Sequence, residues 1–197
     1  WYRSRGLGDV YKRQVKCSMA LEEAILASGG VPKMVRTGHS FMKRELRSNP
    51  EAVMAGEMSG HFFLHDRWPG FDCSLYNAAR LLEIIGRDPA PNDGGVSFSH
   101  RFANLPDYPS TDETKIPLVA GREETMEAVE GAFADMEKST VDGIRVRYPD
   151  GWYLCRPSNT EPILVMRAEG RDDSALEAII TDVNARIGHM LDLSKLR

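Results

Sequence analysis

The sequence predicts an α/β fold in two parts: an α/β unit over residues 15–85 and a C-terminal α+β unit, an antiparallel sheet with helices, over residues 111–197. Two observations predict this organisation. From Val15 onward, apolar segments of strand length alternate with segments of helical periodicity. Residues 86–110 interrupt this alternation with a high density of proline and glycine, which breaks regular structure and is typical of a linker.

Residues 1–14, WYRSRGLGDVYKRQ, show neither helical nor strand periodicity and do not resemble the segment that follows. The chain also starts with Trp1 rather than with methionine. We therefore interpret this stretch as a non-native or disordered leader outside the fold. It is either a flexible natural tag or a cloning or read-through artefact joined to a truncated gene.

The first unit opens with regular α/β elements. A helix is expected over Ala20–Ala27, closed by Gly29-Gly30 and followed by an apolar strand over Val31–Val35. Thr37–Ser40 then opens a second helix.

A short strand over Ala52–Ala55 comes next and leads into the loop Gly56–His61. Asp72 is expected to cap a third helix, because a short polar side chain at this position can accept from the first N–H groups. The apolar residues of that helix recur at helical spacing: Leu75, Ala78, Ala79, Leu82 and Ile85.

The second unit is expected to combine strands and helices. Its elements are a strand at Lys115–Val119, a helix at Glu123–Lys138, strands at Ile144–Tyr148, Trp152–Arg156 and Ile163–Ala168, and a final helix at Asp173–Leu191. A hairpin joins two of these strands, because Pro149 presets a turn and Gly151 supplies positive φ. Phe133 and Met136 are predicted to lie in the core.

Composition excludes some classes of function. The 197 residues carry a formal net charge of −4, which argues against a general nucleic-acid binder, since that needs basic residues in excess on one face. A small anionic ligand needs only a few local cations. No apolar stretch approaches the roughly 20 residues that span a bilayer, so no membrane partner is expected.

Cysteine and histidine spacing suggests no metal site. Cys17, Cys73 and Cys155 are far apart and form no Cys-x-x-Cys pair, so neither a disulfide framework nor a zinc site is predicted, and a reducing cytoplasm is expected. His61 and His65 are four residues apart, but their neighbours suggest a strand rather than a zinc-binding helix.

The strongest polar constellation is the segment Arg156–Pro162, RPSNTEP, between two apolar strands. Arg156 offers a planar fork of donors that matches phosphate oxygens. Ser158 and Thr160 supply hydroxyls and Asn159 an amide, so the segment has the chemistry of a phosphate-binding loop. From chemistry alone, a plain strand-to-strand turn is the alternative.

Four other residues are candidates for ligand binding. Glu57 and Ser59 would point the same way in an extended segment and could hold adjacent hydroxyls of a sugar, against the alternative of a glycine-flanked surface loop. His39 stands at a helix start, where backbone N–H groups could face an anion, against the alternative of a simple N-cap. Lys16 on its own is indistinguishable from a surface lysine.

Four motifs in this order, Lys16-Cys17, TGHS at 37–40, GEMSGH at 56–61 and RPSNTEP at 156–162, resemble those of the α-D-phosphohexomutases, closest to bacterial phosphomannomutase/phosphoglucomutase. The resemblance covers residues 15–197. It implies most of the third domain and the whole fourth domain of a four-domain enzyme, the fourth being TATA-binding-protein-like. The implied sugar ligands are Glu57, Ser59, Lys16 and His39; the implied phosphate ligands are Arg156, Ser158, Asn159 and Thr160, with Arg167 a further candidate outside the loop.

The resemblance also implies a reaction: hexose 1-phosphate and hexose 6-phosphate, of mannose or glucose, interconvert through hexose 1,6-bisphosphate and a phosphoserine, with Mg²⁺. Neither the serine motif nor the Mg²⁺ motif occurs in this sequence, and the Asp-Gly pairs at Asp93, Asp142 and Asp150 stand alone. We therefore expect a C-terminal fragment that binds a phosphosugar and is inactive alone. A non-catalytic phosphosugar-binding module and a fragment of a phosphoglucosamine mutase are the alternatives.

Overall fold

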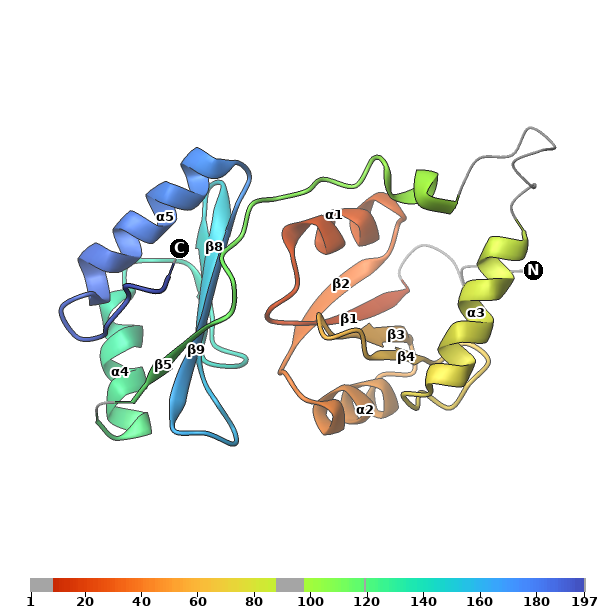
Figure 1. The fold of residues 1–197 in the computed structure, drawn as a ribbon. Coiled ribbons are helices and arrows are strands. Elements are labelled where there is room, and N and C mark those ends of the chain that lie inside the picture. Colours follow the sequence, from red (N-terminus) through yellow and green to blue (C-terminus); the bar gives the residue numbers. More distant parts are fainter. Residues whose placement is uncertain (1–8, 88–97, 119, 197) are drawn as a thin grey trace. The chain divides into compact units, whose positions relative to one another are not determined.

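The computed structural model describes residues 9–87, 98–118 and 120–196, and the first eight residues of the predicted leader lie outside this range (Figure 1). The chain forms two compact units that divide after Asp107, and each is described by itself. This division falls within the predicted 86–110 linker. No helix in the described part of the chain is long and apolar enough to cross a membrane.

The first unit is built on a four-stranded sheet in the order β2-β1-β3-β4 (Figure 1). Its strands are β1 (Val10–Gln14), β2 (Val31–Val35), β3 (Ala52–Gly56) and β4 (Phe62–Leu64). β1 runs parallel to both β2 and β3, whereas β4 is antiparallel to β3. The prediction of β2 is confirmed, and β3 extends one residue beyond its predicted end.

β1 corrects the prediction that residues 1–14 lie outside the fold. Residues 10–14 form the strand between β2 and β3 and pair with β2 along their whole length. A parallel strand between two others is usually a continuous apolar run, whereas Lys12, Arg13 and Gln14 are polar and buried. Backbone pairing on both edges places this segment in the sheet despite its polar side chains.

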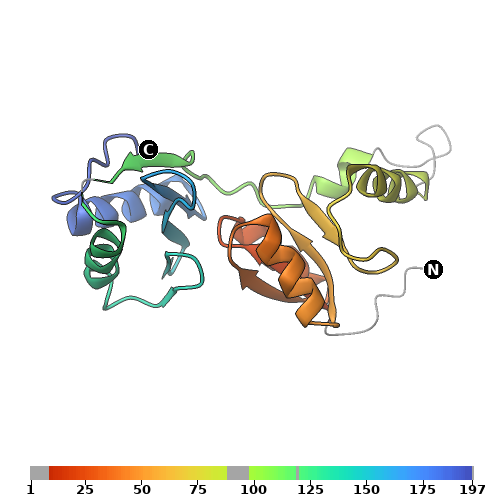
Figure 2. The ribbon, with the colours of Figure 1, turned by 90° about the horizontal axis from the view of Figure 1, so that it is seen from below.

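Two helices, α1 (Met19–Ala27) and α2 (His39–Ser48), cover opposite faces of this sheet (Figures 1 and 2). Neighbouring residues of β1 show this, because successive side chains of a strand point to opposite faces. Arg13 pairs with a glutamate of α1, and Lys12 pairs with Glu45 of α2 at 3.3 Å. The core of the unit lies on the α2 side: Val10, Val35, Met42, Leu46, Ala52, Ala55 and Phe63.

α3 (Ser74–Gly86) differs from its prediction in two respects. Its N-cap is Cys73, whose side chain makes no cap bond. The predicted cap, Asp72, contacts two histidines instead. Its apolar residues also face outward: Leu75 is 81% exposed and Leu82 66%. Within the described residues, α3 is therefore attached mainly through its polar side.

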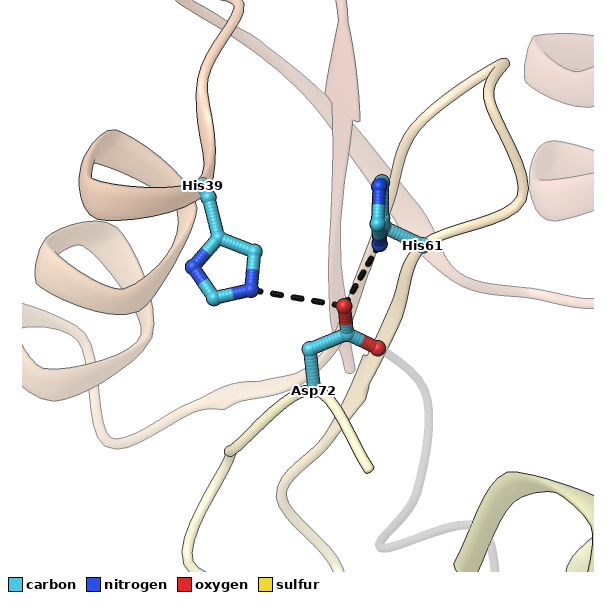
Figure 3. A group of neighbouring side chains, drawn as sticks. All are labelled: His39, His61 and Asp72. Carbon is cyan, nitrogen blue, oxygen red and sulfur yellow. Dashed lines mark hydrogen bonds and ion pairs between the residues drawn. The ribbon is translucent and has the colours of Figure 1, made fainter. Parts of the chain in front are cut away.

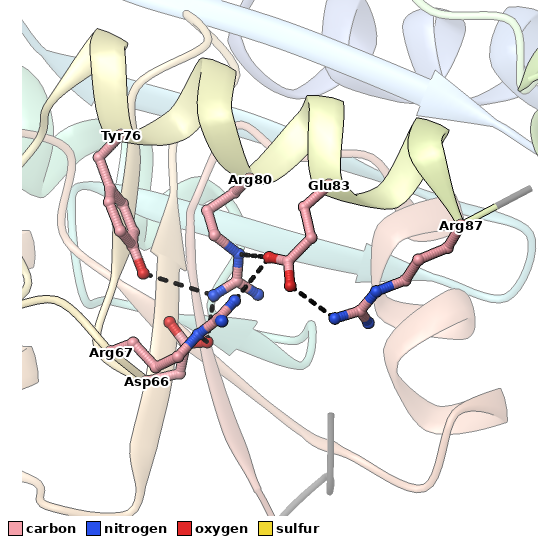
Figure 4. Close-up of polar contacts among 6 residues, drawn as sticks. All are labelled: Asp66, Arg67, Tyr76, Arg80, Glu83 and Arg87. Atoms are coloured by element: carbon pink, nitrogen blue, oxygen red, sulfur yellow. Dashed lines mark hydrogen bonds and ion pairs between the residues drawn. The ribbon is translucent and has the colours of Figure 1, made fainter. Parts of the chain in front are cut away.

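Charged residues connect α3 to the loop before it (Figure 4). Arg80 of α3 donates to Asp66, while Glu83 accepts from Arg67 at 2.6 Å and from Arg87 at 2.5 Å. Burial alone would raise the pKa of Asp66. The hydrogen bonds from Arg80 and from backbone N–H groups outweigh burial and hold this pKa below its ordinary value.

The second unit is a five-stranded antiparallel sheet in the order β5-β9-β8-β7-β6, which confirms the α+β prediction. The strands are β5 (Thr114–Pro117), β6 (Lys138–Ser139), β7 (Ile144–Tyr148), β8 (Gly151–Pro157) and β9 (Ile163–Gly170). Helices α4 (Arg122–Ala132) and α5 (Asp173–Ile187) lie on one face of it (Figure 1). Residues from sheet and helices share one core, which includes Val129, Phe133, Tyr153, Met166, Val183 and Ile187.

The ends of both helices were predicted too far along the chain. α4 ends at Ala132, whose carbonyl accepts from Arg186 of α5 at 2.8 Å, and Lys138 instead begins β6. A neighbouring helix thus satisfies the last carbonyl of α4, which sequence periodicity does not reveal. α5 ends at Ile187 with Gly188 as its C-cap, four residues before the predicted end.

The hairpin between β7 and β8 is confirmed, since Tyr148 pairs with Gly151 across a two-residue turn. The positive φ predicted for Gly151 is wrong, because this glycine is the first residue of β8. A Cβ at Gly151 would lie 2.2 Å from the carbonyl oxygen of Glu169. Glycine is therefore needed here for close strand approach rather than for turn geometry.

Candidate functional site

The predicted phosphate loop joins β8 to β9 in the second unit. Arg156 and Pro157 are the last two residues of β8, so the loop itself covers residues 158–162. At its base, the Ser158 N–H donates to the carbonyl oxygen of Ile163 at 2.9 Å. The loop is thus a short connection held between two central strands of the sheet.

A buried ion pair orients Arg156. Its Nε donates to Oδ2 of Asp142 at 2.9 Å, and its Nη2 lies 3.5 Å from Oδ1 of the same carboxylate. The side chains of Arg156 and Asp142 are 6% and 3% exposed. The carboxylate occupies the Nε edge of the guanidinium, so the opposite edge of the fork is directed away from Asp142.

Ser158 shapes the loop from inside. Its Oγ accepts from the backbone N–H of Thr160 at 3.3 Å and from that of Glu161 at 3.2 Å. Ser158 is 7% exposed, whereas Asn159 and Thr160 are exposed. Ser158 therefore behaves as a turn-forming residue, and the amide and hydroxyl at the tip are the groups that can meet a ligand.

The sequence did not reveal that Asp142 is the partner of Arg156, because the Asp142-Gly143 pair stands alone in the sequence. Gly143 has a φ of +70°, and a Cβ there would lie 2.3 Å from the carbonyl oxygen of Cys155. Glycine is therefore required on both counts. This close approach brings Asp142 against the strand that carries Arg156.

Arg167 follows the phosphate loop in the chain. It is a residue of β9, paired with Leu154 of β8. Its Nη2 donates to the hydroxyl of Ser110 at 2.9 Å, in the segment that leads into the second unit. Arg167 thus connects the sheet to that segment.

The predicted sugar loop connects β3 to β4 in the first unit. The Gly60 N–H donates to the carbonyl oxygen of Glu57 at 3.0 Å, so the loop is a turn rather than the extended segment that was predicted. Gly60 has a φ of +86°, which this turn requires. Ser59 Oγ donates to Oε2 of Glu57 at 3.2 Å, so the two predicted sugar ligands do lie together.

The N-terminus of α2 contacts the sugar loop. The Gly38 N–H donates to Oε1 of Glu57 at 3.2 Å. The anion that this helix end faces is therefore the carboxylate of Glu57, whose negative charge the partial positive charge of the helix N-terminus stabilises. Gly38 has a φ of +132°, where a side chain would be strained. The TGHS and GEMSGH motifs thus form one polar cluster.

His39 points to a different group of residues (Figure 3). Its Nε2 lies 3.3 Å from Oδ2 of Asp72, and Nδ1 of His61 lies 2.5 Å from the same oxygen. The imidazole of His39 also packs edge-on against Phe63, with ring centroids 4.9 Å apart. Asp72 and His61 were not among the predicted site residues.

Lys16 lies in the turn between β1 and α1 and is half-buried. Its neighbour Cys17 lines a pocket of about 290 Å³, together with Glu57 and Met58 of the sugar loop. Apolar side chains from β1, β3 and α1 form most of the remaining wall. Lys16 is not itself a lining residue of this pocket.

Two family models match the chain. The model described as phosphoglucomutase/phosphomannomutase, alpha/beta/alpha domain III, matches residues 4–102. The model described as phosphoglucomutase/phosphomannomutase, C-terminal domain, matches residues 113–186. The first match includes the sugar loop and begins within the predicted leader, and the second includes the phosphate loop.

Curated relatives match most of this chain but only part of their own length. A phosphomannomutase/phosphoglucomutase of Pseudomonas syringae pv. tomato is 42% identical over 182 residues, which are 87% of this chain and 38% of the relative. A phosphoglucomutase of Neisseria meningitidis serogroup A is 42% identical over 178 residues, or 88% of this chain and 37% of the relative. The chain therefore spans less than two fifths of the length of these relatives.

A solved structure has the same fold. The crystal structure of a phosphoglucomutase/phosphomannomutase family protein from Burkholderia thailandensis superposes with a TM-score of 0.79 at 39% identity. The match covers 94% of this chain and 38% of that protein. Sequence and fold therefore indicate the same family.

Proposed function

The chain belongs to the phosphoglucomutase/phosphomannomutase family, and from this membership we propose that it recognises sugar and phosphate for an enzyme that interconverts hexose 1-phosphates and hexose 6-phosphates. The substrates proposed are the phosphates of mannose and glucose, in line with the names of the relatives. The proposed place of action is the cytoplasm, where the thiols of Cys17, Cys73 and Cys155 would stay free.

The oriented guanidinium of Arg156 is the observation that carries this proposal. A buried arginine held by one carboxylate presents its remaining donors in a fixed direction, which favours binding of a tetrahedral anion. Asn159, with an amide, and Thr160, with a hydroxyl, follow in the same loop and are both exposed. Together these groups would bind the phosphate that is not being transferred.

The sugar loop would hold the hexose hydroxyls. Glu57 is fixed by the Gly38 N–H through one carboxylate oxygen, and its other oxygen accepts from Ser59. A sugar hydroxyl would replace or share the bond from Ser59, since a carboxylate oxygen accepts more than one hydrogen bond. This arrangement orients the hexose without a covalent bond, and positioning of this kind is a large part of the rate in group-transfer enzymes.

Mg²⁺, which the family resemblance implies, does not fit the ligand group that converges among the described residues. That group is His39, His61 and Asp72. Mg²⁺ prefers an octahedral shell of oxygen ligands and keeps several waters, whereas two of these three donors are imidazole nitrogens. The proposed role of this chain is therefore recognition, with no step that depends on Mg²⁺ bound to its own residues.

The proposal is tested by calorimetric titration of the chain with mannose 6-phosphate and glucose 1-phosphate. Replacement of Arg156 by alanine should weaken binding by about 1.5–3 kcal/mol, the range for a hydrogen bond to a charged group. Arg147→Ala is the matched control, because Arg147 lies on the neighbouring strand with a side chain that is 74% exposed. Its affinity for both sugars should equal that of the parent chain.

Two results would count against the proposed phosphate loop. Unchanged affinity of Arg156→Ala would return the loop to the interpretation of a plain turn. Equal losses in Arg156→Ala and Arg147→Ala would indicate attraction of the phosphate to general positive charge rather than to an oriented site.

A further inference from the structure

Three side chains from separate segments of the first unit converge on one point (Figure 3). His39 is the first residue of α2, His61 ends the sugar loop, and Asp72 lies in the loop before α3. One ligand atom of each residue lies within 4.8 Å of the others. The rings of the two histidines are nearly perpendicular, at 88°, and both contact Oδ2 of the same carboxylate.

We propose that His39, His61 and Asp72 form a binding site for a divalent transition-metal cation of the zinc type. Two imidazole nitrogens and one carboxylate oxygen are the three protein ligands of one class of open zinc site, in which water takes the fourth position. Bonds of about 2.0–2.2 Å set tetrahedral donors roughly 3.4 Å apart. The His39–Asp72 spacing of 3.3 Å already agrees with this, and a small rotation of His61 would lengthen its 2.5 Å contact.

The surroundings of the cluster suit a cation that enters from solvent. The side chains of His39 and His61 are 45% and 50% exposed, whereas Asp72 is 17% exposed. Access is therefore open on the imidazole side, and the negative charge is partly shielded from water, which strengthens its attraction for a cation. The buried ring of Phe63 packs against His39 and limits the rotation of that imidazole.

His65 shows that proximity in sequence is not what forms this cluster. Its Nδ1 lies 3.2 Å from the carbonyl oxygen of Ala52, and it takes no part in the group around Asp72. The convergence comes from the fold, which brings the start of α2 beside the loops on either side of β4. The site rests on this donor geometry and does not depend on the proposed phosphosugar function.

The test is a calorimetric titration of the full chain with Zn²⁺, with no sugar present, and a parallel titration with Co²⁺ followed by visible absorption. We expect one Zn²⁺ per chain, and the ligand-field absorption of tetrahedral Co²⁺. His39→Gln, His61→Gln and Asp72→Asn should each weaken Zn²⁺ binding by at least about tenfold, since loss even of a residue that only supports a ligand costs about 10- to 100-fold. These near-isosteric changes preserve the volume of each side chain.

Two control variants separate this site from other donors. Cys73→Ser tests the neighbouring thiol, and His100→Gln tests an exposed histidine elsewhere in the first unit. Both should bind Zn²⁺ as the parent chain does. Cys155 is not a competing ligand at neutral pH, because burial raises the pKa of its thiol to about 12.

The outcomes decide the proposal. Unchanged Zn²⁺ affinity in all three cluster variants would overturn it, as would loss of binding in Cys73→Ser alone or the lack of any stoichiometric binding by the parent chain. Thermal unfolding of each variant is measured without metal, and Asp72→Asn serves as the decisive variant if a histidine replacement lowers the unfolding temperature.

Discussion

At the residue scale, Arg156 owes its orientation to a carboxylate 14 positions earlier in the chain. The residues of the proposed phosphate loop stand out in the sequence because they are contiguous, and each residue type has recognisable chemistry. The role of Asp142 could not be predicted, since its contact with Arg156 arises only when β7 pairs with β8 and Gly143 lies against Arg156. His61 and Asp72 were missed for the same reason.

Removal of Asp142 should destabilise the second unit strongly. In Asp142→Ala the Arg156 guanidinium stays buried without its carboxylate, so the free energy of unfolding should fall by about 3–5 kcal/mol. The measurement is chemical denaturation of parent and variant. Glu137→Ala is the control, because its ion pair with Arg147 is exposed on both sides and should contribute within about 1 kcal/mol. Equal effects of the two variants would show that the buried pair has no special role.

At the element scale, predictions succeeded where side-chain pattern and backbone pairing agree. The β7–β8 hairpin and β2 follow their sequence signals. β1 was missed because its buried Lys12 and Gln14 are polar, and the pairing that holds it involves partners 21 or more residues away. α4 was predicted too long because its end depends on Arg186 of another helix. Distant partners thus set the features that periodicity could not predict.

The attachment of α3 should weaken in acid. The pKa of Asp66 in the folded chain is below its ordinary value of 3.8, so its bond to Arg80 contributes fully above that pH. This contribution is lost as the pH falls through the lowered pKa, because the protonated carboxyl no longer pairs with the guanidinium. Amide hydrogen exchange of α3, corrected for intrinsic rates, should therefore accelerate as the pH is lowered below about 4.

Asp66→Asn is the matched variant for this prediction. The amide keeps the shape of the side chain but has no charge to lose, so exchange in α3 should be faster than in the parent chain at neutral pH and should respond less to acid, the remaining response coming from the Glu83–Arg67 pair. α1 serves as the internal reference in both proteins, since the ion pairs of Asp66 are with Arg67 and Arg80. A parent and a variant with the same acid response would rule out Asp66 as the titrating group.

At the scale of the whole molecule, the two proposed recognition loops lie in different units with separate cores. The sugar loop depends on α2 and β3, and the phosphate loop depends on β8 and its neighbours. Each unit therefore supplies one half of the proposed recognition. Fold class and family could be predicted from the sequence because the motifs of both halves are present in order.

The chain by itself should bind hexose phosphates and not interconvert them. Interconversion needs a group that gives and receives a phosphoryl, and the serine motif that has this role in the resemblance is not among the 197 residues. Purified chain incubated with mannose 1-phosphate, glucose 1,6-bisphosphate and Mg²⁺ should produce no mannose 6-phosphate above a protein-free blank, by coupled enzymatic assay. Titration of the same preparation should still show sugar phosphate binding that Arg156→Ala weakens. Turnover that persists through repeated purification and disappears in Arg156→Ala would prove this expectation wrong, because the chain would then contain a phosphoryl carrier of its own.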